Sequence, residues 1–140
     1  MHALQGLVAA IGRILLVAIF LVTAITFYIP KFETAVSMME AEGIPNAKLM
    51  LMGATAFLLI GSFSVMLGFK ARIGALLLAI FLCLATYYFH DFWNMENGSQ
   101  KQQLETIQFL KNASMLGAMI FIIANGGGPG SVSRRKVMVV

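Results

Sequence analysis

The side chains best suited to chemistry gather in two short segments of this 140-residue chain, FHDFW at residues 89–93 and QFLKN at residues 108–112. With one neighbouring carboxylate they supply charged, titratable and hydrogen-bonding groups: His90, Asp91, Trp93, Glu105, Gln108, Lys111 and Asn112. An imidazole changes its protonation state near neutral pH, and ammonium and amide groups donate hydrogen bonds. Such a set suits either the binding of a small head group or a polar link between two helices.

The spacing of the second segment places three of these side chains on one helical face. Glu105, Gln108 and Asn112 are three and then four residues apart, which matches the α-helical turn. Lys111 lies beside this stripe, and we expect Asp91 to be its counter-charge. An ionisable group inside a membrane span costs at least ~2.5 kcal/mol at the bilayer centre, so Lys111 needs a partner, a cavity or a path to the interface.

Two interpretations of this cluster follow. In the first, His90, Asp91 and Lys111 line a pocket for a quinone-like or other small head group. In the second, the charges form a salt bridge that joins a helical hairpin, beside an interfacial aromatic belt of Tyr87, Tyr88 and Trp93.

Arg13 is a further isolated charge, about two turns into the first apolar stretch. We expect a structural role, in which it extends to the interface or caps backbone carbonyls in the segment 125–128. Binding of an anionic lipid is the alternative.

Several other chemistries are excluded by motif or placement. The glycine-rich segment GGGPGS at residues 126–131 lacks the GK[ST] ending of a phosphate-binding loop. No Cys and His residues have zinc-site spacing, and a single cysteine, Cys83, permits no intramolecular disulfide. Net charge is +4, but no basic stripe with interleaved aromatic residues points to nucleic acid. We expect no metal and no intrinsic cofactor; a bound quinone is the one cofactor that the polar cluster suggests.

The elements that must position these groups are four apolar stretches, at residues 7–29, 49–69, 73–89 and 107–124. Each approaches the ~20 apolar residues that a helix needs to cross a bilayer. The whole chain is 59% hydrophobic and only 11% charged, and the runs do not alternate as barrel strands would. The sequence therefore predicts an all-α, four-transmembrane-helix bundle in one domain, residues 1–130, followed by a basic tail, residues 131–140.

Basic residues predict the orientation of this bundle. Six lie on the side that carries the termini and the 70–72 turn, and four lie on the other: Arg13, Lys70, Arg72, Arg134, Arg135 and Lys136 against Lys31, Lys48, Lys101 and Lys111. The positive-inside rule then places both termini in the cytoplasm. We expect an integral protein of the bacterial cytoplasmic membrane, in contact with lipid.

The outer connections carry local signals of their own. Phe32, Val36 and Met39 recur at helical spacing, which predicts a short amphipathic helix on the outer side between spans one and two, either packed as a lid or anchored at the interface. Ser99 with Gln102 predicts a capping box that starts the fourth helix near residue 100. Small residues four apart, at 75, 79 and 83 and at 113 and 117, predict close helix contacts.

The segments FHDFW and LKN, followed by GPG-x-x-S at residues 128–133, resemble the DoxX family of small four-helix membrane proteins. The pair Gly12-Arg13 and the segment EGIP at residues 42–45 are similar to that family too, so the resemblance runs from about residue 12 to 133. This chain departs from the family pattern in span two, where Leu58 replaces an acidic residue and Ser62 a glycine. A glycine and a lysine usual near the end of span one are also shifted or lost, since residues 23–31 keep only Lys31.

The resemblance implies roles but no catalytic residue. One relative is a membrane subunit of a thiosulfate:quinone oxidoreductase, and others are linked with oxidative-stress enzymes or the assembly of membrane proteins. The first hypothesis is an accessory subunit of a quinone-linked redox system, with the electron carrier in a protein partner. The alternatives are a non-enzymatic scaffold or assembly factor, in contact with a partner or a second copy, and a binder of lipid or a small apolar ligand.

Overall fold

A computed structural model describes residues 1–133; the predicted basic tail falls mainly on residues 134–140, which lie outside the described residues. The described residues form helices joined by short connections: α1 (His2–Thr23), the π-helix η1 (Ala24–Tyr28), α2 (Phe32–Ala41), α3 (Ala47–Leu67), α4 (Ala71–Phe89), the 3-10 turn η2 (Phe92–Asn94) and α5 (Gln100–Asn125). Four of these helices are long and apolar enough to cross a membrane. The predicted all-α, four-helix architecture is confirmed.

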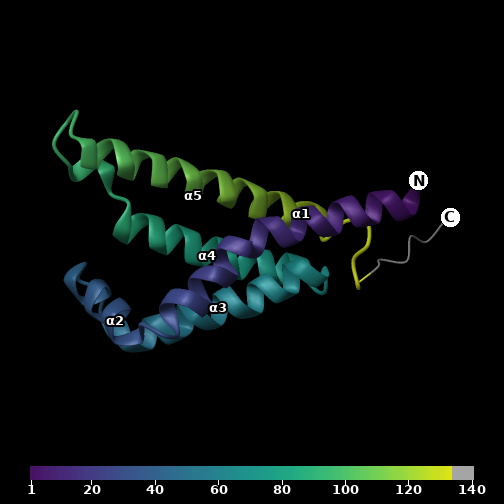
Figure 1. Ribbon diagram of the computed structural model, residues 1–140, viewed down its shortest axis with the longest axis horizontal. Helices are drawn as coiled ribbons and strands as arrows, with labels where there is room; N and C mark the ends of the chain where they lie inside the picture. The colour runs from purple at the N-terminus through teal and green to yellow at the C-terminus, as the bar shows by residue number, and fades with distance from the viewer. Residues whose placement is uncertain (134–140) are drawn as a thin grey trace.

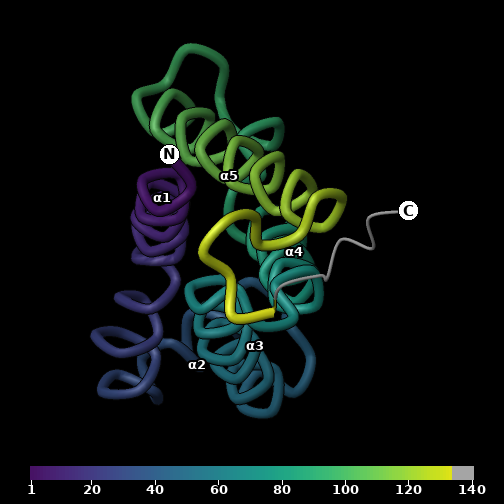
Figure 2. Tube along the Cα trace, turned by 90° about the vertical axis from the view of Figure 1, so that its right-hand side faces the viewer, coloured from purple at the N-terminus to yellow at the C-terminus, as the bar shows by residue number. Residues whose placement is uncertain are grey.

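The two central helices are α3 and α4, with α1 packed along α3 and α5 packed along α4 (Figures 1 and 2). The N-terminus and the end of α5 lie at one end of the molecule, while α2 and η2 lie at the other (Figure 1). We call these the inner and the outer end, following the orientation predicted from the basic residues. That the inner end faces the cytoplasm stays a prediction.

A pair of glycines brings α3 and α4 into backbone contact. A Cβ atom on Gly61 would lie 2.9 Å from the carbonyl oxygen of Gly74, and one on Gly74 would lie 2.8 Å from that of Gly61. Small residues allow such close crossings in lipid, where packing rather than hydrophobic burial drives association. The ridge predicted on α4 is buried at Ala75 and Ala79 but exposed at Cys83, and a Cβ atom on Gly117 would meet only open space.

Each of the four long helices begins before the apolar stretch that predicted it, because backbone hydrogen bonding extends through polar residues until a cap is reached. At the start of α5, the Ser99 hydroxyl accepts a hydrogen bond from the Gln102 N–H at 3.1 Å. The Gln102 side chain accepts one from the Gly98 N–H at 2.9 Å, one residue earlier than a capping box requires. The predicted start near residue 100 is confirmed.

The outer helix α2 is packed against the bundle. Its Ala35 and Val36 are buried with Ala47 and Leu51 of α3 in a small second core. Lys48 of α3 reaches Glu33 of α2 at 3.3 Å, an exposed pair. Of the two roles expected for this helix, the contacts favour the packed one.

Candidate ligand-binding cavity

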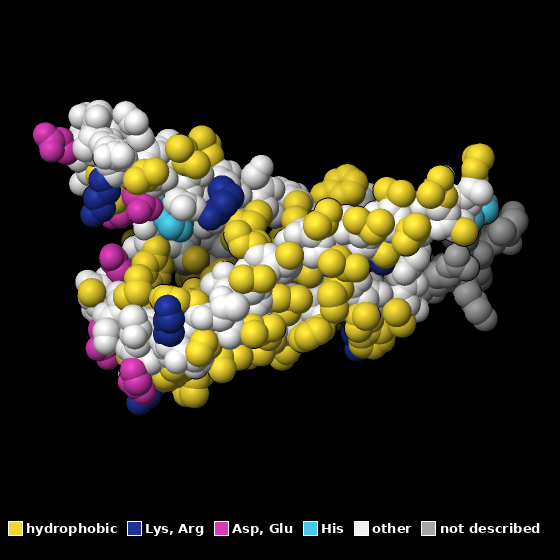
Figure 3. All heavy atoms as spheres, viewed as in Figure 1, with side chains coloured by type: hydrophobic (Ala, Val, Ile, Leu, Met, Phe, Trp, Pro, Cys, Tyr) yellow, Lys and Arg dark blue, Asp and Glu magenta, His cyan; other side chains and the backbone are white. Residues whose placement is uncertain are grey.

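A cavity of about 710 Å³ lies in the outer half of the molecule. Its wall is formed by α1 and η1, α2, α3, α4 and α5 together. Figure 3 shows a hollow at the outer end, with hydrophobic side chains inside it and basic and histidine side chains beside it. Small-molecule sites usually have volumes of ≈ 300–1,000 Å³ and mostly apolar walls, so this cavity has the size of a binding site.

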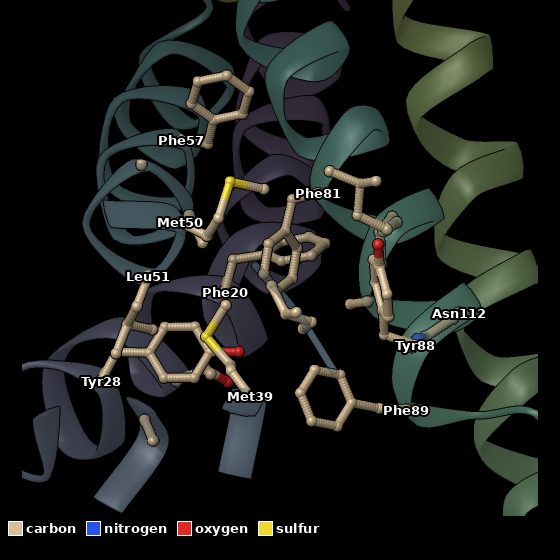
Figure 4. Close-up of a pocket in the computed structure, with 18 of the residues that line it drawn as sticks. Phe20, Tyr28, Met39, Met50, Leu51, Phe57, Phe81, Tyr88, Phe89 and Asn112 are labelled. Carbon is tan, nitrogen blue, oxygen red and sulfur yellow. The ribbon is translucent and has the colours of Figure 1, made fainter. Parts of the chain in front are cut away.

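Of the 26 residues that line the cavity, eleven are aromatic or methionine: Phe20, Phe27, Tyr28, Met38, Met39, Met50, Phe57, Phe81, Tyr88, Phe89 and Met115. Figure 4 shows several of them directed toward a common space from α1, α3 and α4. Phe20 and Tyr28 each meet Phe81 edge to face, with ring centroids 6.4 Å apart. Methionine side chains are unbranched and adaptable, so such a wall fits irregular apolar groups.

The π-helix η1 shapes one side of this wall. The Ile29 N–H donates to the carbonyl oxygen of Ala24, five residues back, at 3.0 Å. Phe27 and Tyr28 lie in this wider turn and line the cavity. Isolated π-turns occur often at functional sites, and no residue pattern in this segment signals one in advance.

Polar groups gather where α4 and α5 border the cavity. Among the residues that line it are His90, Lys111 and Asn112, all three predicted as site residues. Asn112 is only 7% exposed, and its Nδ2 donates to the Thr86 hydroxyl at 3.0 Å. This bond orders the two helices at the polar side of the cavity, and Thr86 is a contact that the sequence analysis missed.

The imidazole of His90 is held by a carboxylate. Its Nδ1 lies 2.7 Å from Oε2 of Glu105, and both side chains are largely buried. Because a carboxylate only accepts hydrogen bonds, Nδ1 is the donor in this contact. Glu105 therefore reaches the cavity through His90 and does not line it directly.

The pairing expected between Asp91 and Lys111 is wrong. Lys111 donates instead to the side-chain oxygen of Gln108, one turn earlier in α5, and Asp91 accepts from Asn94 Nδ2 at 2.9 Å. The reason is local: α4 ends at Phe89, and Asp91 then starts the turn η2, which directs its carboxylate into that turn.

Trp93 also lies away from the cavity. Its ring packs against Phe92 and Phe109, with centroids 5.3 and 6.1 Å away, and 51% of the residue is exposed. Of the seven predicted site residues, the structure thus brings three to the cavity and a fourth, Glu105, within one hydrogen bond of it. Asp91, Trp93 and Gln108 do not line it.

Arg13 forms a separate polar site at the inner end. It is 6% exposed and donates hydrogen bonds to the carbonyl oxygens of Gly127, Pro129 at 3.1 Å and Gly130 at 3.1 Å, with a longer contact to Met66 at 3.4 Å. The capping expected over 125–128 is seen at Gly127 and extends two residues beyond that segment. Its guanidinium thereby ties the chain after α5 to α1.

Four apolar helices around a mainly apolar cavity define an integral membrane protein. The helices pack against one another on some of their faces, and their remaining faces contact lipid. The model of the DoxX family matches residues 8–91, and the chain belongs to this family. The resemblance found in the sequence is confirmed.

Two curated relatives extend this finding. Inner membrane protein YqjF of Escherichia coli is 28% identical over 134 residues, which cover 96% of this chain and 95% of that protein. The Surfeit locus protein 4 homolog of Schizosaccharomyces pombe is 28% identical over 72 residues, 51% of this chain; the match spans only 24% of that relative's length. No solved structure matches.

The two residues at which span two was expected to depart from the family pattern, Leu58 and Ser62, are buried between the helices, with Leu58 in the larger of the two hydrophobic cores. Leu58 is fully buried there. Ser62 is also fully buried, and its hydroxyl has no hydrogen-bond partner among residues 1–133. Neither residue lines the cavity.

Proposed function

We propose that this DoxX protein binds a lipid-soluble small molecule with an apolar body and a polar head in the outer cavity. The observation that carries this proposal is the joint placement of an aromatic and methionine wall with His90, Lys111 and Asn112 at one side. A fully apolar cavity would suit hydrocarbon alone, whereas convergent polar groups fix the orientation of a ligand.

The redox version of the proposal takes the ligand to be a quinone at the outer leaflet of the bacterial cytoplasmic membrane. His90 and Lys111 would hydrogen-bond its head group, and a membrane-bound partner would supply the electron carrier. In support stand the chain's membership of the DoxX family and its similarity along nearly its whole length to an inner membrane protein of E. coli. On this basis the protein is an accessory subunit, and the partner performs the redox chemistry.

The test is to fill the cavity without disturbing the helices. Gly53 of α3 lines the cavity and has open space where a Cβ atom would stand, so Gly53→Phe places a ring in the ligand's volume. Gly117→Phe is the matched control, since Gly117 also faces open space but lies away from the cavity. Native mass spectrometry of protein in nanodiscs containing native lipid extract and added quinone would detect the retained ligand.

We expect the wild-type protein and Gly117→Phe to retain a ligand, and Gly53→Phe to lose it. Retention of the same ligand by Gly53→Phe, or no ligand on any of the three proteins, would refute binding in this cavity. The scaffold hypothesis would then take precedence, because it needs contact surfaces and no cavity.

A further inference from the structure

We infer that the head group bound in the cavity is an anionic oxygen group: the carboxylate of a free fatty acid or the phosphate of a phospholipid. This inference rests on the proposed function and specifies the class of its ligand. It would make the cavity a site for an anionic amphiphile rather than for a neutral quinone.

The charged residues that line the cavity have one sign. The two lining residues that can carry positive charge are Lys111 and His90. The chain has six acidic residues, namely Glu33, Glu40, Glu42, Asp91, Glu96 and Glu105, and none of them lines the cavity. The wall is therefore cationic at its polar side, and a ligand's charge would complement it only if negative.

Lys111 has no carboxylate partner among the described residues. Its ammonium group contacts the neutral amide of Gln108 instead. Lys111 is exposed, but residue 111 lies about one turn inside the predicted span, where a charged group needs a partner or a path to the interface. An anionic head group in the cavity would supply the missing counter-charge.

The polar groups next to Lys111 already have hydrogen-bond partners. Glu105 accepts from His90 Nδ1 at 2.7 Å, so its negative charge is directed at the imidazole. The Asn112 amide nitrogen donates to Thr86 at 3.0 Å. Among these groups Lys111 keeps the largest free donor capacity, because an ammonium has three N–H groups and Gln108 takes one.

The remaining volume suits an acyl chain. The cavity of about 710 Å³ is lined in part by phenylalanine, tyrosine and methionine side chains from six elements. Such side chains offer apolar contact to a flexible chain without demanding a planar ring. The ammonium would bind the head, and the aromatic and methionine wall would bind the chain.

The experiment compares ligands that share a chain and differ in the head. The protein in nanodiscs of zwitterionic phosphatidylcholine is titrated with the fluorescent fatty acid cis-parinaric acid and with the corresponding neutral alcohol. We expect the acid to bind about tenfold more tightly, a difference of about 1.4 kcal/mol, since a hydrogen bond to a charged partner is stronger than one to a neutral partner. Lys111→Met should abolish the preference and Lys111→Arg should retain it. Lys101→Met is the matched control, because Lys101 is exposed on the same helix and lies outside the cavity.

Competition separates the two sources of the anion. Displacement of the probe by palmitate alone identifies a free fatty acid, and displacement by phosphatidic acid identifies a phospholipid; either supports the inference. Equal binding of the acid and the alcohol, or an unchanged preference in Lys111→Met, would overturn it while the cavity still binds amphiphiles. Displacement by ubiquinone but by neither anion would overturn it in favour of the redox version. Absence of binding by every probe would instead refute the proposed function itself.

Discussion

At the scale of single residues, local contacts determine which side chains of the polar cluster pair with one another. Lys111 pairs with Gln108 at i−3 on its own helix, a spacing at which helical side chains are neighbours. The more distant carboxylate of Asp91 is turned away by the end of α4. The sequence identified the participating residue types, because polar groups in an apolar span are conspicuous. It did not predict their pairing, which depends on where the chain reverses.

The hydrogen bond between Asn112 and Thr86 leads to a prediction on stability. Thr86→Val keeps the shape of the side chain and removes the hydroxyl that accepts from Asn112 Nδ2. The mutation should lower the free energy of unfolding by about 1 kcal/mol, because a buried amide loses its partner. Reversible unfolding in mixed micelles, followed by circular dichroism, would measure this loss.

A double mutant and a control make that prediction specific. Thr86→Val combined with Asn112→Leu should cost less than the sum of the two single mutations, because the second change removes the unsatisfied amide. Thr26→Val is the control, since the Thr26 hydroxyl only donates to the carbonyl oxygen of Val22 in its own helix. Strict additivity of the two mutations would show that the bond contributes nothing.

At the scale of elements, hydropathy predicted which helices exist but not how they meet. The ridge at Ala113 and Gly117 of α5 is exposed, whereas α3 and α4 come into backbone contact at Gly61 and Gly74. Small residues permit a close contact on any face that carries them, so their spacing alone does not select the face. The π-turn η1 could not be predicted either, because no recognisable motif marks it. Its hydrogen bond over five residues occurs where Tyr28 packs against the core.

The glycine crossing predicts opposite effects for two similar substitutions. In Gly74→Ala, the new Cβ atom would lie 2.5 Å from the Ser64 side chain and 2.8 Å from the Gly61 carbonyl oxygen, so α3 and α4 must separate at a cost of about 1–3 kcal/mol. Gly117→Ala meets open space and should stabilise α5 by about 0.5–1 kcal/mol through helix propensity. Melting temperatures in the same detergent should therefore fall for the first variant and rise for the second. A fall of equal size in both would contradict the close crossing.

At the scale of the whole molecule, the all-α membrane fold could be predicted because lipid imposes a strong length and polarity requirement on each span. The cavity could not be predicted, because its wall consists of the same residue types that face lipid elsewhere. Phe57 lines the cavity while Phe63 is exposed on the same helix, and no pattern in the sequence distinguishes them. Only the relative placement of six elements separates an internal apolar surface from an external one.

The orientation of the molecule in the membrane is the last prediction. The sequence predicts six basic residues on the inner side, where the N-terminus and the end of α5 lie (Figure 1), and four on the outer side. The positive-inside rule therefore places α2 and the η2 connection outside the cell.

Because Cys83 is the single cysteine, a Cys83→Ala background allows one reporter cysteine at a time. Glu96→Cys, next to η2, should react with a membrane-impermeant maleimide in intact cells, whereas Ser133→Cys, after α5, should react only once the membrane is permeabilised. Labelling of Ser133→Cys but not of Glu96→Cys in intact cells would reverse the orientation and place the cavity in the cytoplasmic leaflet.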